Sequence, residues 1–146
     1  MRAFNSVQAR DEAILVSRIL LVVLFAVSGW GKLTSFGGTV AYMAQIGVPV
    51  PSVAAFVATA VELLGAIAIA VGVWTRPVAL VLALFTLGTA LIGHPFWTME
   101  GAGRYANAIS FYKNVSIIAA FLLLYVTGPG KYSVDARLGS PAASPV

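Results

Sequence analysis

The chain has 146 residues, of which 60% are hydrophobic and only 10% are charged, and its net charge at pH 7 is +4. Soluble domains carry about 25% charged residues, so this composition indicates a membrane protein. The basic residues are scattered rather than clustered, which argues against a nucleic-acid-binding surface. The absence of cysteine excludes a thiol redox centre and a thiolate-bound metal or iron–sulfur cluster held by this chain alone.

Four apolar stretches are long enough to cross a bilayer as helices. They are expected at about residues 13–33, 52–73, 77–97 and 106–127, within a membrane domain of residues 13–138. The second and third stretches are joined only by Trp74, Thr75 and Arg76, so these two helices must form an antiparallel hairpin. Since helices satisfy their own backbone hydrogen bonds in lipid, the sequence predicts an all-α, four-transmembrane-helix up-down bundle.

The segments around these stretches are polar or rich in Gly and Pro. Residues 1–12 are expected to form a cytoplasmic N-terminal segment, and residues 139–146 a disordered tail. The connection at 34–51 has room for a short interfacial helix around Val40–Ile46. A cleaved signal peptide is the alternative for the N-terminus, but Arg18 interrupts the apolar run, which favours a retained first helix.

The distribution of Lys and Arg predicts the orientation of the bundle. One side would hold the two termini and the loop between the second and third spans, with Arg2, Arg10, Arg76, Lys131 and Arg137. The other side would hold Arg104, with Lys32 and Lys113 at helix ends. Because cytoplasmic segments are enriched in Lys and Arg, both termini are expected to face the cytoplasm.

Glu62 is the most informative residue in the chain. It lies inside the second apolar stretch, where a charged side chain costs about 3 kcal/mol if nothing offsets it. The small residues Ala55, Ala58, Gly65 and Ala66 flank it on the same side of the helix. Small residues allow close helix packing in lipid, so Glu62 is expected to face the bundle interior. It could act there as a proton relay or be held in a structural ion pair.

Glu62 needs a partner, and the other spans offer two candidates. Arg18 on the first helix is favoured over Lys113 on the fourth, because the forked donors of Arg suit a buried carboxylate. Arg18 could instead extend to the headgroups. Lys32 shares a helix face with Arg18 and Phe25, but its place at a helix end favours an interfacial anchor.

The remaining unusual polar residues gather at the outer ends of the third and fourth spans. They predict a cavity in the outer half of the bundle, lined by Glu62, His94, Lys113 and Asn114. The alternative is a closed hydrogen-bond network without room for a ligand. No metal site is expected, and a single His cannot supply both axial ligands of a haem.

These residues occur in a recognisable order, and together they resemble the DoxX family of small four-helix membrane proteins. The resemblance covers roughly residues 13–138. It rests on Arg18, SGWGKL (28–33), Glu62 with GAIAIAVGVWTRPVAL (65–80), His94, FYKNVSIIAAFLLLY (111–125) and GPGKYSVD (128–135). The family is named after a component of a quinone-linked oxidase system, and many members have no assigned biochemistry.

The resemblance implies a multi-pass protein of the bacterial inner membrane, linked to quinone chemistry. Arg18, Glu62, His94, Lys113 and Asn114 are the candidate ligand-binding residues, for a quinone as the only cofactor and with a redox partner protein. Two other functions stay open. The protein could be a non-catalytic membrane module that scaffolds a partner or binds lipid. It could also be a small proton-coupled transporter, which would require a homo-oligomer because four helices make a thin wall.

Overall fold

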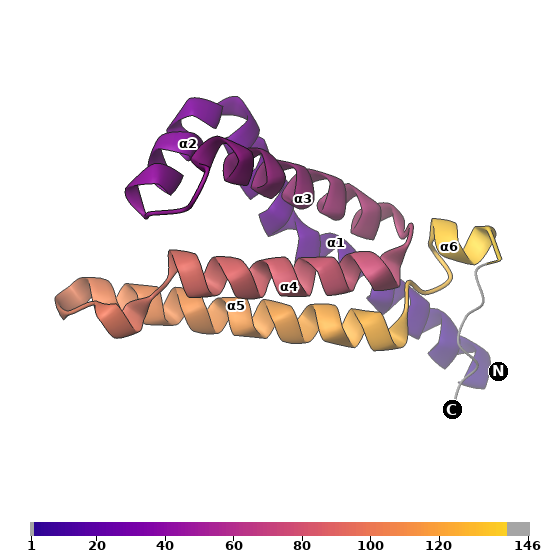
Figure 1. Ribbon diagram of the computed structural model, residues 1–146. Coiled ribbons are helices and arrows are strands. Elements are labelled where there is room, and N and C mark those ends of the chain that lie inside the picture. Colours follow the sequence, from indigo (N-terminus) through magenta and orange to yellow (C-terminus); the bar gives the residue numbers. More distant parts are fainter. Residues whose placement is uncertain (1, 140–146) are drawn as a thin grey trace.

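The computed structural model describes residues 2–139 as a set of helices joined by short loops (Figure 1). The helices are α1 (Arg2–Thr34), α2 (Phe36–Gln45), α3 (Pro51–Val71), α4 (Thr75–Gly93), the 3-10 helix η1 (Phe96–Thr98), α5 (Gly101–Thr127) and α6 (Val134–Arg137). Four segments are long and apolar enough to cross a membrane, Val7–Thr34, Pro51–Val71, Thr75–Thr98 and Gly101–Thr127. The predicted all-α fold with four spans is confirmed.

The helix bounds differ most from the hydropathy boundaries at two places. α1 begins at Arg2 rather than near residue 13, and α5 begins at Gly101 rather than near residue 106. In both cases the helix continues into polar sequence, because hydropathy marks where lipid ends and not where hydrogen bonding along a helix ends. The expected short helix in the first connection is present as α2. Residues 140–146, which include most of the predicted disordered tail, lie outside the described residues.

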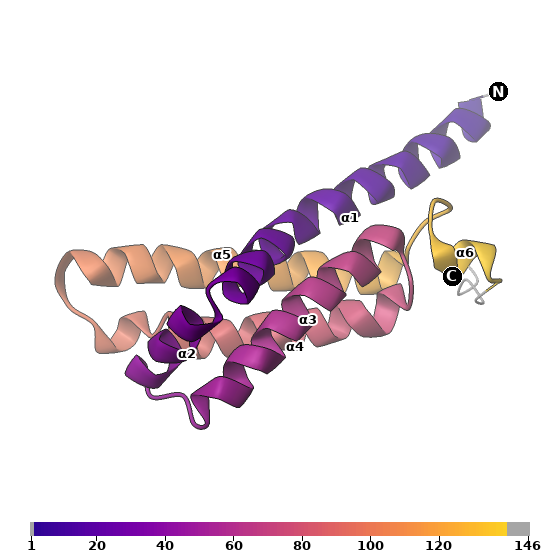
Figure 2. The ribbon, with the colours of Figure 1, turned by 90° about the horizontal axis from the view of Figure 1, so that it is seen from above.

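The spans pack as two pairs. α1 lies mainly against α3 and α4 lies mainly against α5, whereas α1 and α5 touch over a short stretch only. Seen from above, α1 crosses α5 at an angle (Figure 2). α2 and η1 lie at one end of the bundle, here called the α2 end, and α6 lies at the other, called the α6 end (Figure 1).

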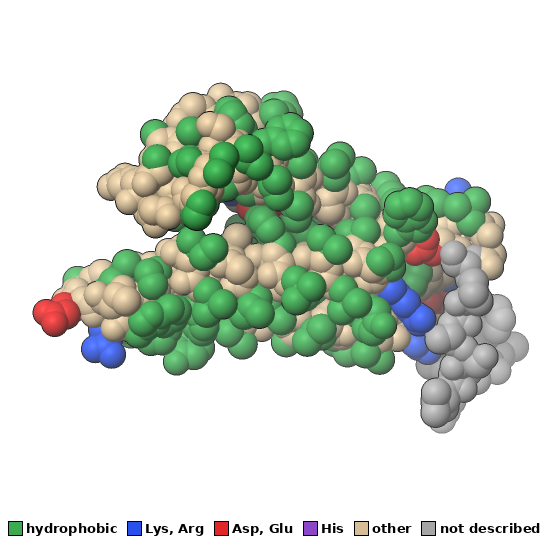
Figure 3. All heavy atoms as spheres, in the orientation of Figure 1, with side chains coloured by type: hydrophobic (Ala, Val, Ile, Leu, Met, Phe, Trp, Pro, Cys, Tyr) green, Lys and Arg blue, Asp and Glu red, His purple; other side chains and the backbone are tan. Residues whose placement is uncertain are grey.

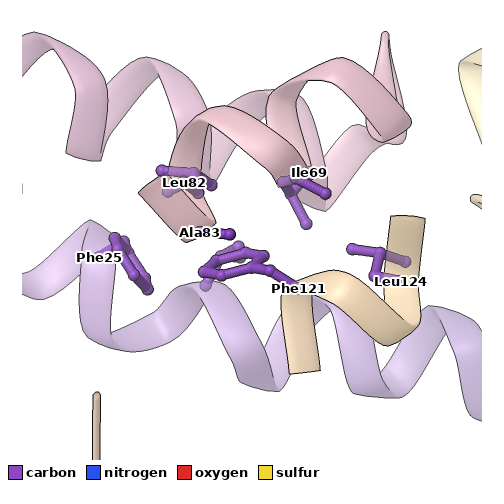
Figure 4. Close-up of a cluster of buried hydrophobic side chains, with 9 residues drawn as sticks. Phe25, Ile69, Leu82, Ala83, Phe121 and Leu124 are labelled. Carbon is purple, nitrogen blue, oxygen red and sulfur yellow. The ribbon is translucent and has the colours of Figure 1, made fainter. Parts of the chain in front are cut away.

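A buried apolar cluster joins the two pairs near the middle of the bundle (Figure 4). The aromatic rings of Phe25 on α1 and Phe121 on α5 meet edge to face, with centroids 5.3 Å apart. Ile69 from α3 and Leu82 from α4 complete the contact, and both are fully buried. Hydrophobic residues also cover the outside of the spans, while charged residues gather at the two ends (Figure 3). This surface is the one that contacts the lipid bilayer.

The C-terminal segment folds back onto the α3–α4 hairpin at the α6 end. The carboxylate of Asp135 accepts hydrogen bonds from the backbone N–H groups of Trp74, at 2.8 Å, and Thr75, at 2.9 Å. These are unpaired donors at the start of α4, where a negative charge is favourable. The backbone N–H of Asp135 donates to the carbonyl of Gly72 at 2.9 Å. The turn between α3 and α4 is thereby attached to α6.

Candidate functional site

Glu62 is buried in the bundle interior and forms an ion pair with Lys32. The Nζ of Lys32 lies 3.0 Å from Oε1 and 2.8 Å from Oε2 of Glu62. The Glu62 side chain is 8% exposed and that of Lys32 24%. The same Nζ donates to the hydroxyl oxygen of Ser28 at 2.6 Å. The prediction that Glu62 faces inward and has a charged partner is confirmed.

The predicted identity of that partner was wrong. Arg18, the favoured candidate, lies at the α6 end and donates to backbone carbonyls of Ala70, Tyr132 and Pro129. Lys113, the second candidate, makes no ion pair among the residues described. Lys32 was assigned to the interface because it lies at the end of its span. Its long flexible stem nevertheless carries the ammonium back to a carboxylate deeper in the bundle.

Gly29 allows α1 to lie close enough to α3 for this pairing. A Cβ atom at Gly29 would lie 2.8 Å from Cγ of Leu63 and 3.1 Å from Cβ of Glu62. Gly29 is one residue after Ser28 and three before Lys32, so the close approach falls at the level of the ion pair. Helix packing in lipid relies on small residues at such crossings.

A cavity of about 520 Å³ opens beside the ion pair at the α2 end. Residues of α1, α2, α3, α4 and α5 all contribute to its wall. Its polar lining includes Ser28, Lys32, Glu62, His94 and Asn114. The rest is mostly apolar, from residues of α2, α3 and α4 such as Met43, Ile46, Val57, Phe85 and Ile92. The corresponding hollow lies between α2–α3 and α4 in the space-filling view (Figure 3).

A hydrogen bond between two of the polar residues orients His94. Its Nδ1 lies 3.1 Å from Oδ1 of Asn107 on α5. The amide nitrogen of Asn107 in turn donates to the carbonyl of Gly103 at 3.0 Å. Because the amide nitrogen points to the carbonyl of Gly103, the amide oxygen is the atom that faces the ring. Asn107 was not among the predicted site residues.

A second cavity of about 460 Å³ lies between α1 and α5 and shares Leu24, His94 and Asn114 with the first. Lys113 lines this second cavity and does not line the first. Of the five candidate ligand residues, the main cavity therefore brings together Glu62, His94 and Asn114. Arg18 borders neither of these cavities.

One signal in the sequence pointed to Lys32. Arg18, Phe25 and Lys32 were placed on one face of the first helix, and all three are buried or half-buried against the rest of the bundle. A lysine on a buried face, and not merely at a helix end, needs a partner in the interior.

Comparison with known proteins agrees with this architecture. The DoxX family model matches residues 13–95. The chain is 47% identical to the inner membrane protein YphA of Escherichia coli (strain K12) over 137 residues, covering 94% of this chain and 98% of that protein. It is 44% identical to the inner membrane protein YqjF of the same organism over 131 residues, covering 88% and 93%.

A more distant relative carries a functional name. "Putative oxidoreductase CatD" of Bacillus subtilis (strain 168) is 32% identical over 77 residues, which cover 53% of this chain and 56% of that protein. No solved structure gives a significant match. The match over more than half of the chain and the two nearly full-length relatives lead to one conclusion: the chain belongs to the DoxX family and is an inner-membrane protein with four candidate transmembrane helices.

Proposed function

We propose that the protein binds the head group of a quinone or quinol and serves as a component or accessory subunit of a quinone-linked oxidoreductase system. The observation that carries this proposal is the cavity of about 520 Å³, which combines a mostly apolar wall with a buried ion pair. Its volume lies in the range of about 300–1,000 Å³ that is typical of small-molecule sites.

The distribution of groups in the cavity suits a lipid-soluble ring with polar substituents. Met43, Ile46 and Ile92 offer contacts for an apolar ring edge and tail. Glu62 and His94 offer hydrogen-bonding atoms for the substituents. A soluble metabolite would leave most of this wall without a matching polar group, whereas a quinone head with its tail toward lipid would not.

Glu62 would handle the proton in this scheme. Oxidation of a quinol to a quinone releases two protons and two electrons. The electrons would pass to a redox partner protein. One quinol hydroxyl would give its proton to the Glu62 carboxylate, beside which Lys32 stabilises the negative charge, and the other would give its proton to the ring of His94 in the same cavity. The name of the Bacillus subtilis relative, "Putative oxidoreductase CatD", supports this class of chemistry.

The proposal also assigns an orientation. With both termini in the cytoplasm, the α2 end faces outward and the cavity lies in the outer half of the membrane. Five basic residues in the terminal segments or near the ends of the spans would then face the cytoplasm, Arg2, Arg10, Arg76, Lys131 and Arg137.

The test is quinone binding by the purified protein in lipid nanodiscs. Decylubiquinone should bind to the native chain, and Asn114→Leu should remove binding while the protein stays folded. Tyr125→Leu is the matched control, because Tyr125 lies on the same helix and does not line the main cavity. Extraction should also recover quinone from protein purified out of native membranes.

A different result would favour the non-catalytic module. If the protein carries no quinone and binds none, and Asn114→Leu lowers the yield of folded protein, then the polar groups serve only to hold the helices together.

A further inference from the structure

We infer that the main cavity recognises the reduced, hydroxyl-bearing form of its ligand in preference to the oxidised carbonyl form. This inference rests on the proposed function and deepens it. It comes from counting which polar atoms of the cavity still have a free donor or acceptor.

The ammonium of Lys32 keeps one donor at most for a ligand. A lysine ammonium has three N–H groups. In the described residues Oγ of Ser28 accepts one of them, and the carboxylate of Glu62 accepts at least one, since its two oxygens lie too close together to receive a separate, well-aligned N–H each. A ligand carbonyl could therefore accept from one N–H of Lys32 at most, whereas the Glu62 oxygens each keep a lone pair to accept a further hydrogen bond.

His94 presents an acceptor for a separate reason. The amide oxygen of Asn107 faces Nδ1, so Nδ1 must carry the hydrogen of the neutral ring. Nε2 then carries only a lone pair. Among the side chains that the structure describes, none makes a hydrogen bond to Nε2. The ring lines the cavity, and Nε2 is the nitrogen left for a ligand.

The cavity threonines supply no free donor. Thr86 donates its hydroxyl hydrogen to the carbonyl of Leu82 at 2.7 Å, and Thr89 donates to the carbonyl of Thr86 at 3.0 Å. The side chains of Ser28, Tyr42 and Asn114 can donate or accept, so these groups do not discriminate.

The acceptors of the cavity therefore outnumber its donors. Glu62 and Nε2 of His94 can only accept, and in the described lining Lys32, with one N–H at most, is the group that can only donate. A carbonyl oxygen placed against Glu62 or His94 would meet lone pairs, whereas a hydroxyl would donate to them. Sites built to pair a hydroxyl strongly reject the analogue that lacks it, because their buried acceptors are left unpaired.

In this arrangement Asn107 is a positioning residue. It lines neither cavity and acts through the ring of His94. Its replacement should change the preference between two ligands without removing the cavity.

The experiment compares matched ligands on the full chain in nanodiscs. The redox pair is decylubiquinol, kept reduced under anaerobic conditions, and decylubiquinone. The redox-inert pair is 4-nonylphenol and its methyl ether, which share a ring and a tail and differ in the donor. We expect the quinol and the phenol to bind about tenfold or more tightly than their partners.

Variants test whether His94 and Asn107 set this preference. Asn107→Leu should reduce the ratio of the two dissociation constants to near one. Asn107→Gln, which keeps a neutral amide oxygen as an acceptor for Nδ1, should retain more of the ratio than Asn107→Leu. Tyr125→Leu is the control, since Tyr125 lies on α5, lines neither cavity and should leave the ratio unchanged.

The outcomes separate this inference from the proposed function. Equal or tighter binding of the quinone and the methyl ether, lost in Asn114→Leu, overturns the inference and leaves quinone binding in place. A donor preference that Asn107→Leu does not alter overturns the role given to Asn107 and His94. No binding of any of the four ligands overturns both proposals.

Discussion

Lys32 on α1 and Glu62 on α3 form a two-point contact, in which one ammonium donates to both carboxylate oxygens at 3.0 and 2.8 Å. The pair joins the two helices at the level where the main cavity opens. The same contact therefore stabilises the α1–α3 packing and determines which hydrogen-bonding atoms the cavity presents.

Removing the cation should be more harmful than neutralising the acid. Lys32→Met leaves the Glu62 carboxylate buried without its charge partner, and we expect a loss of about 2–4 kcal/mol in the free energy of unfolding. Glu62→Gln keeps a hydrogen-bonding group of the same shape and should cost less, while Glu62→Leu should cost more than Glu62→Gln. Unfolding in mixed detergent micelles measures these differences.

The control for this series is Lys131→Met, because Lys131 is exposed and lies at the opposite end of the bundle. The double variant Lys32→Met with Glu62→Gln should be more stable than Lys32→Met alone. If Lys32→Met is no worse than Lys131→Met, the ion pair contributes nothing to stability.

Gly29→Ala should separate α1 from α3. The added methyl group would lie 2.8 Å from the Leu63 side chain and 3.1 Å from Cβ of Glu62, so we expect a loss of about 1–3 kcal/mol in the free energy of unfolding. Gly31→Ala provides the comparison, because a Cβ there meets nothing within 4 Å. Thermal unfolding of the two purified variants should give a clearly lower midpoint for Gly29→Ala, and equal midpoints would contradict the close approach.

Gly72→Ala should weaken the α6 end of the bundle. Gly72 has φ +72°, and a Cβ there would lie 2.5 Å from Cβ of Ser133 and 2.6 Å from Nη1 of Arg18. Gly47→Ala isolates the backbone contribution, because Gly47 has φ +76° and open space around it. A left-handed alanine costs about 1 kcal/mol, so Gly47→Ala should lose that amount in unfolding free energy and Gly72→Ala distinctly more.

Protease sensitivity gives a second measurement of the same effect. In Gly72→Ala the segment around α6 should be cleaved faster than in the native protein. Unchanged cleavage would mean that the C-terminal segment stays docked without this contact.

Cysteine labelling can test the orientation cleanly, because the native chain has no cysteine. Gln8→Cys and Leu138→Cys should stay unlabelled by an impermeant maleimide in intact cells, and Ala102→Cys should be labelled. All three should react once the cells are permeabilised. Labelling of either of the first two in intact cells would reverse the orientation and place the cavity in the inner half of the membrane.

Hydropathy and helical periodicity were sufficient for much of this architecture. The four spans, the α3–α4 hairpin and the short α2 helix were all predicted. So was the inward face of α3, because Ala55, Ala58, Gly65 and Ala66 share a side with Glu62 and all are buried. These features depend on hydrogen bonds within one helix and on its contact with lipid. Each segment of the sequence therefore carries the information for its own helix.

The partners of Arg18 could not be predicted from local sequence patterns. Its partners are backbone carbonyls at Ala70, Pro129 and Tyr132, two of them in the segment that folds back from the C-terminus. Periodicity places Arg18 on a buried face but carries no information about which distant carbonyls reach it. A buried guanidinium can be hydrogen-bonded by carbonyl groups or by an acid, and only the packed chain decides which of them lie within reach.

The sequence by itself determined the membrane class, the helices, their inward faces and the need of Glu62 for a partner. These follow from the burial of apolar surface and from the cost of an unpaired charge, and both depend on the type of each residue and on its position in its own segment. Only the tertiary structure decided that the partner is Lys32, that His94 is held by Asn107 and that Lys113 does not line the main cavity. These features depend on the angle and depth at which helices cross. The crossing is set by many small contacts, such as that of Gly29 with Leu63, that no single stretch of sequence contains.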